Sequence, residues 1–436
     1  MPLRSLRRQR ALDPARSTPL FARRAGRVWC EEVPLERIAA RVGTPAYVYS
    51  KTSIRLAYQR LDAAFRSLPH TLCYAVKANS NLTLLRLFAR LGSSFDIVSG
   101  GELYRLRSIG VPGRRIVFSG VGKTPEEIRE ALRAGILMLN VESEAELELV
   151  AREAARLGLA APAAIRVNPD VAAGGHPHIS TGHHLHKFGV DWSDARRLYR
   201  VWKDSRWIEW RGISAHIGSQ ILSVTPFERA VRRLASCVRE LRRDGIDLRY
   251  FDFGGGIGIR YWKEDPLAIG EYARAVASAI RPLGCHLLLE PGRVLVGPAG
   301  VLLTRVLYTK RTRGKNFVIV DAGMNDFMRP ALYGAIHPIS QADLGNVGAG
   351  LAPPASKVDV VGPVCETSDC FVHDWRMEDV QSGDLLVLWG TGAYGFVSAT
   401  NYNSRCCPPE VLVEGRRFRI IRRRESLADL TRGEIV

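Results

Sequence analysis

One lysine stands out by its position in the sequence. Lys77 follows Thr71–Val76, an apolar run with the pattern of a buried strand, and precedes a loop that contains Asn and Ser. Because an unpaired buried ammonium is costly, such a lysine is expected to be exposed, paired or used in chemistry. One use is a Schiff base with a carbonyl cofactor. A surface lysine that closes a strand is the alternative, and the rest of the chain must decide between them.

Other polar or Gly-rich segments also follow apolar runs. Each has a functional and a structural interpretation: the Gly-rich segment could hold a phosphate with its N–H groups or form a tight turn, and the histidine could stack on a ligand or pack in the core. The acid–turn–arginine segment favours polar contacts with a ligand over a simple salt-bridged loop. These segments are Ser99–Glu102, Asn168–Asp170, His216–Gln220, Gly254–Gly256 and Glu290–Arg293. The glycines do not form the dinucleotide fingerprint, because Ile259 stands where its third glycine is needed.

Two further groups of residues could carry chemistry. Cys365 lies beside Glu366, and this thiol could be a proton donor or part of a buried turn; their spacing alone does not choose. Five histidines lie between His176 and His186 in a Gly-rich segment without an accompanying carboxylate or cysteine pattern. We therefore expect an active-site loop there and no metal site.

Eight short apolar runs must position these segments. They lack strict alternation, as strands of a buried parallel sheet do, and helical stretches separate them. The runs are Leu72–Val76, Ser94–Val98, Ile116–Ser119, Leu137–Val141, Ala163–Val167, Gly212–Ile217, Tyr250–Phe253 and Cys285–Leu289. Eight such units predict a (β/α)₈ barrel over residues 50–300, with its chemistry at the C-terminal ends of the strands.

The pattern changes after residue 300. Strand-like runs broken by Gly, Pro and charged turns predict an all-β domain over residues 301–436. Residues 28–49, with a short strand, a helix over 33–42 and a second strand over 46–49, are expected to join it. The runs after residue 300 are Val301–Tyr308, Phe317–Val320, Val358–Val361, Leu385–Trp389 and Val411–Val413, and Gly345–Pro354 is expected to be an exposed loop.

Composition excludes some classes of protein. With 436 residues, 46% of them hydrophobic, the chain can bury a large core, and no apolar run approaches the ~18 residues of a membrane span. The net charge of +18 could indicate nucleic-acid binding, but the basic residues are spread along the chain among acidic ones, without an RNA-binding motif. Eight cysteines without a Cys-x-x-Cys pair, and no secretory signal, favour reduced thiols in the cytoplasm.

The first 27 residues hold eight Arg and one Asp, and they lack the apolar segment of a signal peptide. We expect a disordered basic extension. An organelle-targeting segment and a start assigned too far upstream are the alternatives.

Taken together, these motifs resemble the diaminopimelate decarboxylase family, which belongs to the pyridoxal phosphate enzymes of the alanine-racemase-like fold. The resemblance runs from about residue 33 to 413 and rests on ordered motifs. They are Tyr74–Asn79, Ser99–Leu103, His216–Gln220, Glu290–Arg293, Asp321–Asp326, Arg329–Tyr333, Gly362–Glu366, Gly392–Gly395 and Asn401–Ser404. The variation within residues 176–186, Cys406-Cys407 and the basic N-terminus depart from the family pattern.

The resemblance implies a role for each candidate residue. Lys77 would hold pyridoxal 5'-phosphate as a Schiff base, His216 would stack on its ring, and Glu290 would bond the ring nitrogen. Cys365 would return a proton to the substrate carbon. Cofactor contacts would come from Ser219, Gly254, Gly255, Gly256, Gly292, Arg293 and Tyr394, and substrate contacts from Arg293, Arg329, Tyr333, Glu366 and Tyr394.

The same resemblance implies a reaction and an assembly. The reaction would convert meso-2,6-diaminopimelate to L-lysine and CO₂, the last step of lysine biosynthesis, in a homodimer whose subunits share each active site. A related decarboxylase of basic amino acids or polyamine precursors is the alternative within this class. A catalytically inactive regulatory homologue is disfavoured because Lys77, Glu290 and Cys365 are all present.

Overall fold

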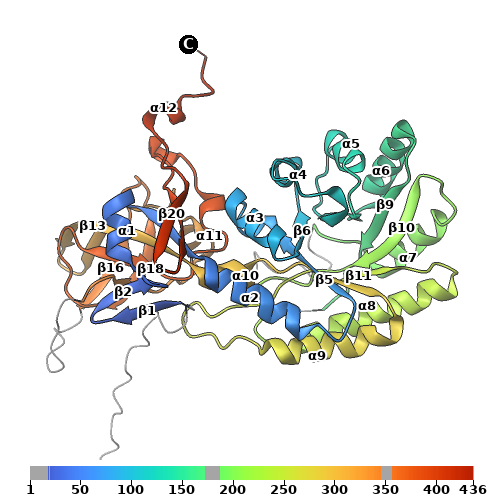
Figure 1. Cartoon of the computed structure of the whole chain (residues 1–436), viewed down its shortest axis with the longest axis horizontal. Helices are drawn as coiled ribbons and strands as arrows, with labels where there is room; N and C mark the ends of the chain where they lie inside the picture. The colour runs from blue at the N-terminus through green and yellow to red at the C-terminus, as the bar shows by residue number, and fades with distance from the viewer. Residues whose placement is uncertain (1–17, 19, 172–186, 345–355, 436) are drawn as a thin grey trace, which may run out of the picture.

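The structure, a computed structural model, describes residues 18, 20–171, 187–344 and 356–435. A closed barrel of parallel strands lies at one end and a mixed β-sheet at the other (Figure 1). The barrel strands are β5 (His70–Ala75), β6 (Ser94–Ile97), β7 (Ile116–Phe118), β8 (Met138–Val141), β9 (Ala161–Arg166), β10 (Ile208–Ser214), β11 (Tyr250–Asp252) and β12 (His286–Leu289). They close in the order β10-β11-β12-β5-β6-β7-β8-β9, which confirms the predicted barrel with a separate β-sheet region.

A helix follows each barrel strand, and the longer helices cover the outside of the barrel. These helices are α3 (Leu82–Arg90), α4 (Gly100–Arg107), α5 (Pro125–Arg133), α6 (Glu144–Leu157), α7 (Trp192–Val201), α8 (Thr225–Arg243), α9 (Ile269–Ile280) and the short α10 (Arg293–Val296). Several begin at a side-chain cap, as where Thr124 and Glu127 form a capping box at α5. The predicted helix after residue 50 is α2 (Lys51–Ala64).

The strand before the key lysine ends earlier than its sequence pattern indicates. Strand β5 stops at Ala75, and Val76–Ala78 form a 3₁₀ turn that contains Lys77. A distant segment holds this turn, because the Tyr394 N–H donates to the Ala78 carbonyl at 2.8 Å. Sequence periodicity cannot register such a tertiary contact, so the end of the strand was misplaced by one residue.

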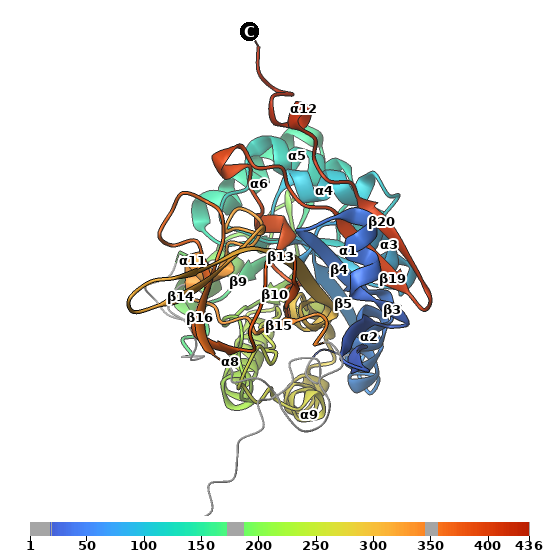
Figure 2. The ribbon, with the colours of Figure 1, turned by 90° about the vertical axis from the view of Figure 1, so that its left-hand side faces the viewer.

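The second sheet has nine strands, with β4 (Ala46–Ser50) lying between β13 (Gly300–Arg311) and β19 (Glu410–Glu414). The other strands are β14 (Asn316–Val320), β15 (Ile339–Gln341), β16 (Ser356–Val361), β17 (Cys370–Met377), β18 (Leu385–Leu388) and β20 (Arg417–Arg422). Strands β15, β17 and β20 were not predicted, because β15 is very short and the charged residues of β17 and β20 hide the apolar pattern. The helices α1 (Leu35–Val42), α11 (Arg329–Tyr333) and α12 (Leu427–Leu430) also belong to this end (Figure 2).

The expected disorder of residues 1–27 is wrong at its C-terminal end. Phe21–Arg24 forms strand β1, which pairs with β2 (Arg27–Cys30), and β2 pairs with β3 (Val33–Pro34). Phe21 is buried and packs edge-on against Trp389 with ring centroids 6.1 Å apart. The excess of arginine masked this short strand. Residues 1–17 and 19, the His-rich segment 176–186 and the predicted loop 345–354 lie outside the described residues.

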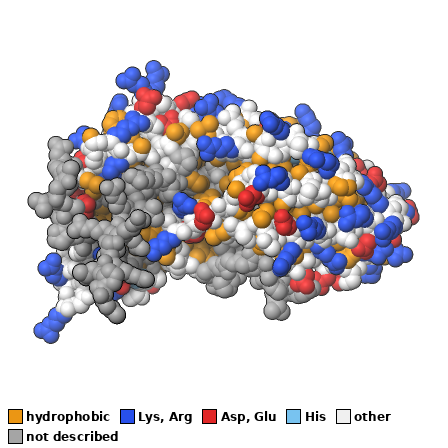
Figure 3. Space-filling model, turned by 90° about the horizontal axis from the view of Figure 1, so that it is seen from below, with side chains coloured by type: hydrophobic (Ala, Val, Ile, Leu, Met, Phe, Trp, Pro, Cys, Tyr) orange, Lys and Arg blue, Asp and Glu red, His pale blue; other side chains and the backbone are white. Residues whose placement is uncertain are grey.

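The described part of the chain contains no helix long and apolar enough to cross a membrane. Lys and Arg side chains are spread over the face in Figure 3, among acidic and apolar ones. This distribution agrees with a general bias toward arginine and shows no single basic stripe on that face.

Candidate active site

A cavity of about 570 Å³ opens at the C-terminal ends of the barrel strands. The predicted residues that line it are Lys77, His216, Ser219, Gly256, Glu290, Gly292, Arg293, Arg329, Tyr333 and Tyr394. The barrel contributes most of them, and the β-sheet region contributes Arg329, Tyr333 and Tyr394. The fold therefore gathers residues that lie more than 300 positions apart in the chain.

Lys77 is held as an ammonium ion in this cavity. Its Nζ donates to Asp96 Oδ2 at 2.7 Å, and Asp96 is fully buried at the base of the lysine. Burial by itself lowers the pKa of Lys77, but the charges of Asp96 and Glu290 outweigh it and raise that pKa. The Lys77 amine must therefore lose a proton before it can attack a carbonyl group.

Glu290 lies at the end of β12 among other carboxylates. Burial raises its pKa well above the usual range, and the charges of Asp252 and Asp96 raise it further. The Ser119 hydroxyl donates to Glu290 Oε1 at 3.3 Å. Asp96 Oδ1 has no hydrogen-bond partner among the described residues, so this cluster has room for another donor.

The glycine segment after β11 is shaped by its contacts with His216. Gly254 has φ +63°, and a Cβ there would lie 2.7 Å from His216 Nδ1. The Gly255 N–H donates to His216 Nδ1 at 3.1 Å, which places the proton of a neutral ring on Nε2. Burial, with Arg166 and Lys77 nearby, lowers the pKa of His216 and keeps the ring neutral.

Only part of the predicted phosphate cradle faces the cavity. Gly256 lines it, whereas the N–H groups of Gly254 and Gly255 are donated to Asp252 and His216 within the protein. Gly292 approaches the lysine turn closely, since a Cβ there would lie 2.9 Å from Ala78 Cβ. The phosphate role therefore remains a prediction for Gly254 and Gly255, and their observed contacts are structural.

Two guanidinium groups, from Arg293 and Arg329, enter the cavity together. Arg293 donates to Ser219 Oγ at 2.8 Å and lies 4.8 Å from the centroid of the Tyr394 ring. Arg329 is stacked 5.2 Å from the Tyr261 ring, and its Nε donates to His337 at 3.3 Å.

The charge balance of the cavity favours an anionic ligand. Burial lowers the pKa of Arg329, and neighbouring Arg293 lowers it further, so an added carboxylate would relieve both effects. Of the charged side chains that line the cavity from the described part of the chain, Glu290 is the one acid, beside Lys77, Arg166, Arg293 and Arg329. This donor set fits pyridoxal phosphate, which brings a phosphate for the cations and an aldehyde for the amine.

Cys365 and Glu366 do not join this cavity in the described part of the chain. Both are exposed, the Cys365 N–H donates to Asn403 Oδ1 at 2.8 Å, and the Tyr402 hydroxyl donates to Glu366. A single chain therefore leaves the predicted proton donor outside the site.

Some lining residues were not given roles by the sequence. Ser119, Arg166 and Phe188 also line the cavity, and Arg166 lies 4.8 Å from the Phe188 ring. Arg166 ends strand β9, so its strand-end position was the available signal. Phe188 carried no such signal.

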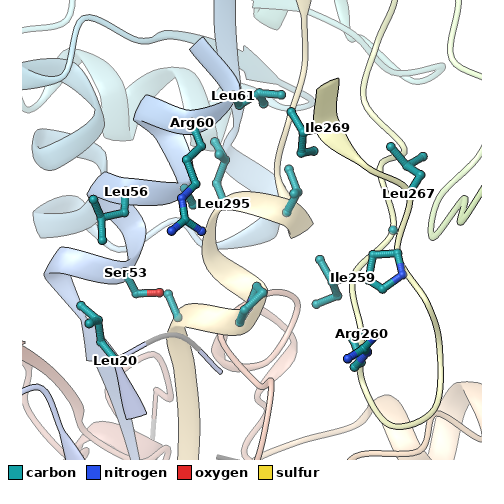
Figure 4. Close-up of a pocket in the computed structure, with 16 residues that line it drawn as sticks. Leu20, Ser53, Leu56, Arg60, Leu61, Ile259, Arg260, Leu267, Ile269 and Leu295 are labelled. Carbon is teal, nitrogen blue, oxygen red and sulfur yellow. The ribbon is translucent and has the colours of Figure 1, made fainter. Parts of the chain in front are cut away.

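A second cavity of about 470 Å³ lies between α2, α10 and the segment after the glycines (Figure 4). It is lined mainly by apolar residues such as Leu56, Leu61 and Leu295, with Arg60 and Arg260 at its edge. No predicted site residue lines it. Among the described residues, no group of three His, Cys, Asp or Glu side chains is arranged to hold a metal ion.

Comparison with known proteins identifies the class. Residues 51–297 match the family model of the pyridoxal-dependent decarboxylases, pyridoxal binding domain. A diaminopimelate decarboxylase of Neisseria meningitidis serogroup A is 46% identical over 408 residues, which cover 94% of this chain and 99% of that protein.

Solved structures agree with this match. Diaminopimelate decarboxylase from Helicobacter pylori, complexed with L-lysine, is 42% identical with a TM-score of 0.87, covering 91% of this chain and 98% of that one. The M. jannaschii enzyme, also with L-lysine, is 36% identical with a TM-score of 0.90, covering 96% and 98%. The chain is thus a pyridoxal-dependent decarboxylase by fold and site. Within that class, it belongs to the diaminopimelate decarboxylase family.

Proposed function

We propose that this protein uses pyridoxal phosphate to remove one carboxyl group from meso-2,6-diaminopimelate, releasing CO₂ and L-lysine. The observation that carries the proposal is the convergence of Lys77, Glu290 and the pair Arg293 and Arg329 in one cavity. An amine for the cofactor, an acid for its ring and cations for a dicarboxylic substrate are the groups that this reaction needs. The identity to relatives of that name supports the same substrate.

Pyridoxal phosphate, when bound, supplies a ring that accepts the electron pair left behind when CO₂ departs. Lys77 would bind it covalently, and His216 would cover one face of its ring. The phosphate would be held by Gly254–Gly256, the backbone around Gly292, and the Tyr394 hydroxyl, with Ser219 and Arg293 nearby.

The protein's own groups prepare that chemistry. Asp96, already bonded to Lys77 Nζ, is placed to take the proton that the amine must lose. Glu290 would face the ring nitrogen and keep it protonated, which strengthens the electron sink. His216, neutral by burial, would stack on the ring without adding positive charge.

Substrate recognition would rest on the distal carboxylate. Arg329 and Arg293 offer planar donor groups suited to a carboxylate, and Tyr333 offers a hydroxyl. Glu366 would accept from the distal ammonium. Arg329 and Arg293 are already buried in the cavity. The distal carboxylate of the substrate would therefore complete an existing cationic pocket.

Cys365 and Glu366 would reach the site of a second copy of the chain. Their exposure and their place outside their own cavity support a homodimer with two shared sites. In each site, the Cys365 thiol from the partner would return a proton to the substrate carbon. We also place the enzyme in the cytoplasm, where free thiols persist; fractionation of cells would test this location.

The deciding experiment measures cofactor binding and substrate turnover in the same preparation. Purified protein with added pyridoxal phosphate should be yellow, and borohydride should fix the cofactor on Lys77, as peptide mapping would show. The same preparation should release lysine and CO₂ from meso-diaminopimelate. A cofactor on a different lysine, or equal kcat/KM for ornithine and diaminopimelate, would contradict the proposal.

A further inference from the structure

A buried carboxylate lies directly behind Glu290 without facing the cavity. Asp252 ends strand β11, is 0% exposed, and does not line the cavity in the described structure. Hydrogen bonds through Asn140 and Ser119 connect it to Glu290. Asp252 therefore cannot touch a ligand, but it can act through Glu290.

Neutral donors hold Asp252 in place. Asn140 Nδ2 donates to Asp252 Oδ2 at 2.8 Å, and the Gly254 N–H donates to Oδ1 at 3.1 Å. The same Asn140 amide donates to Ser119 Oγ at 3.1 Å, and Ser119 donates to Glu290 at 3.3 Å. Residues from β8, from β11 and from the segments after β7 and β12 thus connect both acids in one hydrogen-bonded network.

The network favours a charged Asp252 beside a protonated Glu290. Burial raises the pKa of Asp252 to about 6, while the N–H donors from Asn140 and Gly254 lower it. Burial, followed by the charges of Asp252 and Asp96, raises the pKa of Glu290 well above its usual range.

We propose that Asp252 is a positioning residue that keeps a proton between Glu290 and the ring nitrogen of the bound cofactor. This inference rests on the proposed function. Glu290 would give its proton to the ring nitrogen: its O–H bond would break, the electron pair would stay on the carboxylate, and a ring N–H bond would form. The neighbouring negative charge of Asp252 would stabilise the resulting cation.

Other charged groups around Glu290 set the background for this effect. Asp96 from β6 adds negative charge, Lys77 adds positive charge, and the Ser119 hydroxyl is neutral. Asp252 differs from Asp96 because its contacts lead to Glu290 and not to the lysine.

The test follows the ring proton directly. Holoenzyme would be prepared with pyridoxal phosphate labelled with ¹⁵N in the ring, and the ¹⁵N chemical shift would be measured against pH. The unmodified enzyme should keep its ring nitrogen protonated at neutral pH and lose that proton only at the alkaline end of the titration. Asp252→Asn should lose that proton at a pH lower by at least about one unit, a tenfold change in proton affinity.

Two further variants make the outcome decisive. Asn140→Ala removes a donor that keeps Asp252 charged, so it should shift the ring titration in the same direction by less. Asp244→Asn removes an equal charge at the C-terminal end of α8, outside the barrel, and should leave the ring titration unchanged. If Asp252→Asn does not fold, the ring titration of Asn140→Ala still tests the role of Asp252.

The possible failures are distinguishable. Identical titrations in Asp252→Asn, Asn140→Ala and the unmodified enzyme, with cofactor on Lys77, would overturn the role of Asp252 alone. Failure of the unmodified protein to bind the cofactor would instead overturn the proposed function.

Discussion

The ion pair between Lys77 and Asp96 sets the starting state of the site. The buried carboxylate holds the amine protonated, and a protonated amine is not a nucleophile. The same contact keeps the lysine pointed at the cofactor position before any ligand arrives. Reactivity and preorganisation therefore depend on the same hydrogen bond.

Removing this carboxylate should change the pH at which the lysine reacts. In Asp96→Asn, the pKa of Lys77 should fall because the opposing charge is lost, so more free amine exists at a given pH. The pH profile for covalent cofactor binding should move to lower pH by about one to three units. Stopped-flow absorbance after mixing apoenzyme with cofactor would measure this profile. An unchanged profile would show that Asp96 does not control the amine.

Arg329 should control substrate choice. Its guanidinium is buried, so a substrate without the distal carboxylate would leave a desolvated cation unpaired. Sites of this kind discriminate on the order of 10⁴-fold, and Arg329→Ala should lose most of that preference for diaminopimelate over lysine and ornithine. Ratios of kcat/KM would measure the effect.

Arg60→Ala provides the matched control for this substitution, because it removes a cation from the second cavity. It should leave the preference intact. A full preference in Arg329→Ala would assign the distal carboxylate to Arg293 or to another group.

Among the elements, the β1–β2 hairpin ties the N-terminal end to the second sheet. Phe21 contacts Trp389 from the far end of the chain, and Arg23 donates to the Gln341 carbonyl at 2.9 Å. A cut at residue 27 would remove these contacts, although the sequence by itself predicted a disordered extension up to that residue.

Truncations should separate the two parts of this segment. Removing residues 1–17 should leave activity and unfolding nearly unchanged, since the described contacts of the hairpin remain. Phe21→Ala should lower the free energy of unfolding by about 3–5 kcal/mol, the usual loss for a buried phenylalanine. Chemical denaturation of both variants would test this. Arg24→Ala, at the outer end of the same strand, is the control and should have little effect.

In the whole molecule, the Lys77 amine lies in the barrel cavity, whereas the Cys365 thiol lies at the surface of the second part of the chain. We propose the division into a barrel over residues 50–300 and a β-domain over 28–49 and 301–436, with residues 20–27 added to the latter. Arg329, Tyr333 and Tyr394 reach the barrel cavity from that second part. Cys365 belongs to the same part but is turned to the surface.

A shared site predicts complementation between inactive subunits. Lys77→Ala and Cys365→Ala should each be nearly inactive alone, whereas their mixture should regain up to about a quarter of the unmodified activity if random pairing gives half heterodimers with one intact site each. Activity after subunit exchange, with sedimentation to prove dimers, would measure this. Continued inactivity in proven heterodimers would place the thiol and the lysine in the same chain.

Much of this architecture follows from local sequence properties. Eight apolar runs without alternation indicate a buried parallel sheet, and barrel geometry places their C-terminal ends together. The order of polar residues after those runs therefore predicted that Lys77, His216 and Glu290 would meet. This succeeded because strand burial and strand direction are recorded in neighbouring residues.

Tertiary structure alone decided the rest. Phe21 became part of a strand because it packs on Trp389, and the lysine turn begins early because Tyr394 binds it. The hydrogen-bonded path from Asp252 through Asn140 and Ser119 to Glu290 crosses several barrel strands, and the exposure of Cys365 depends on how the second sheet folds. Each depends on contacts between distant residues, whose energies are set by burial and charge in three dimensions and leave no periodic trace along the chain.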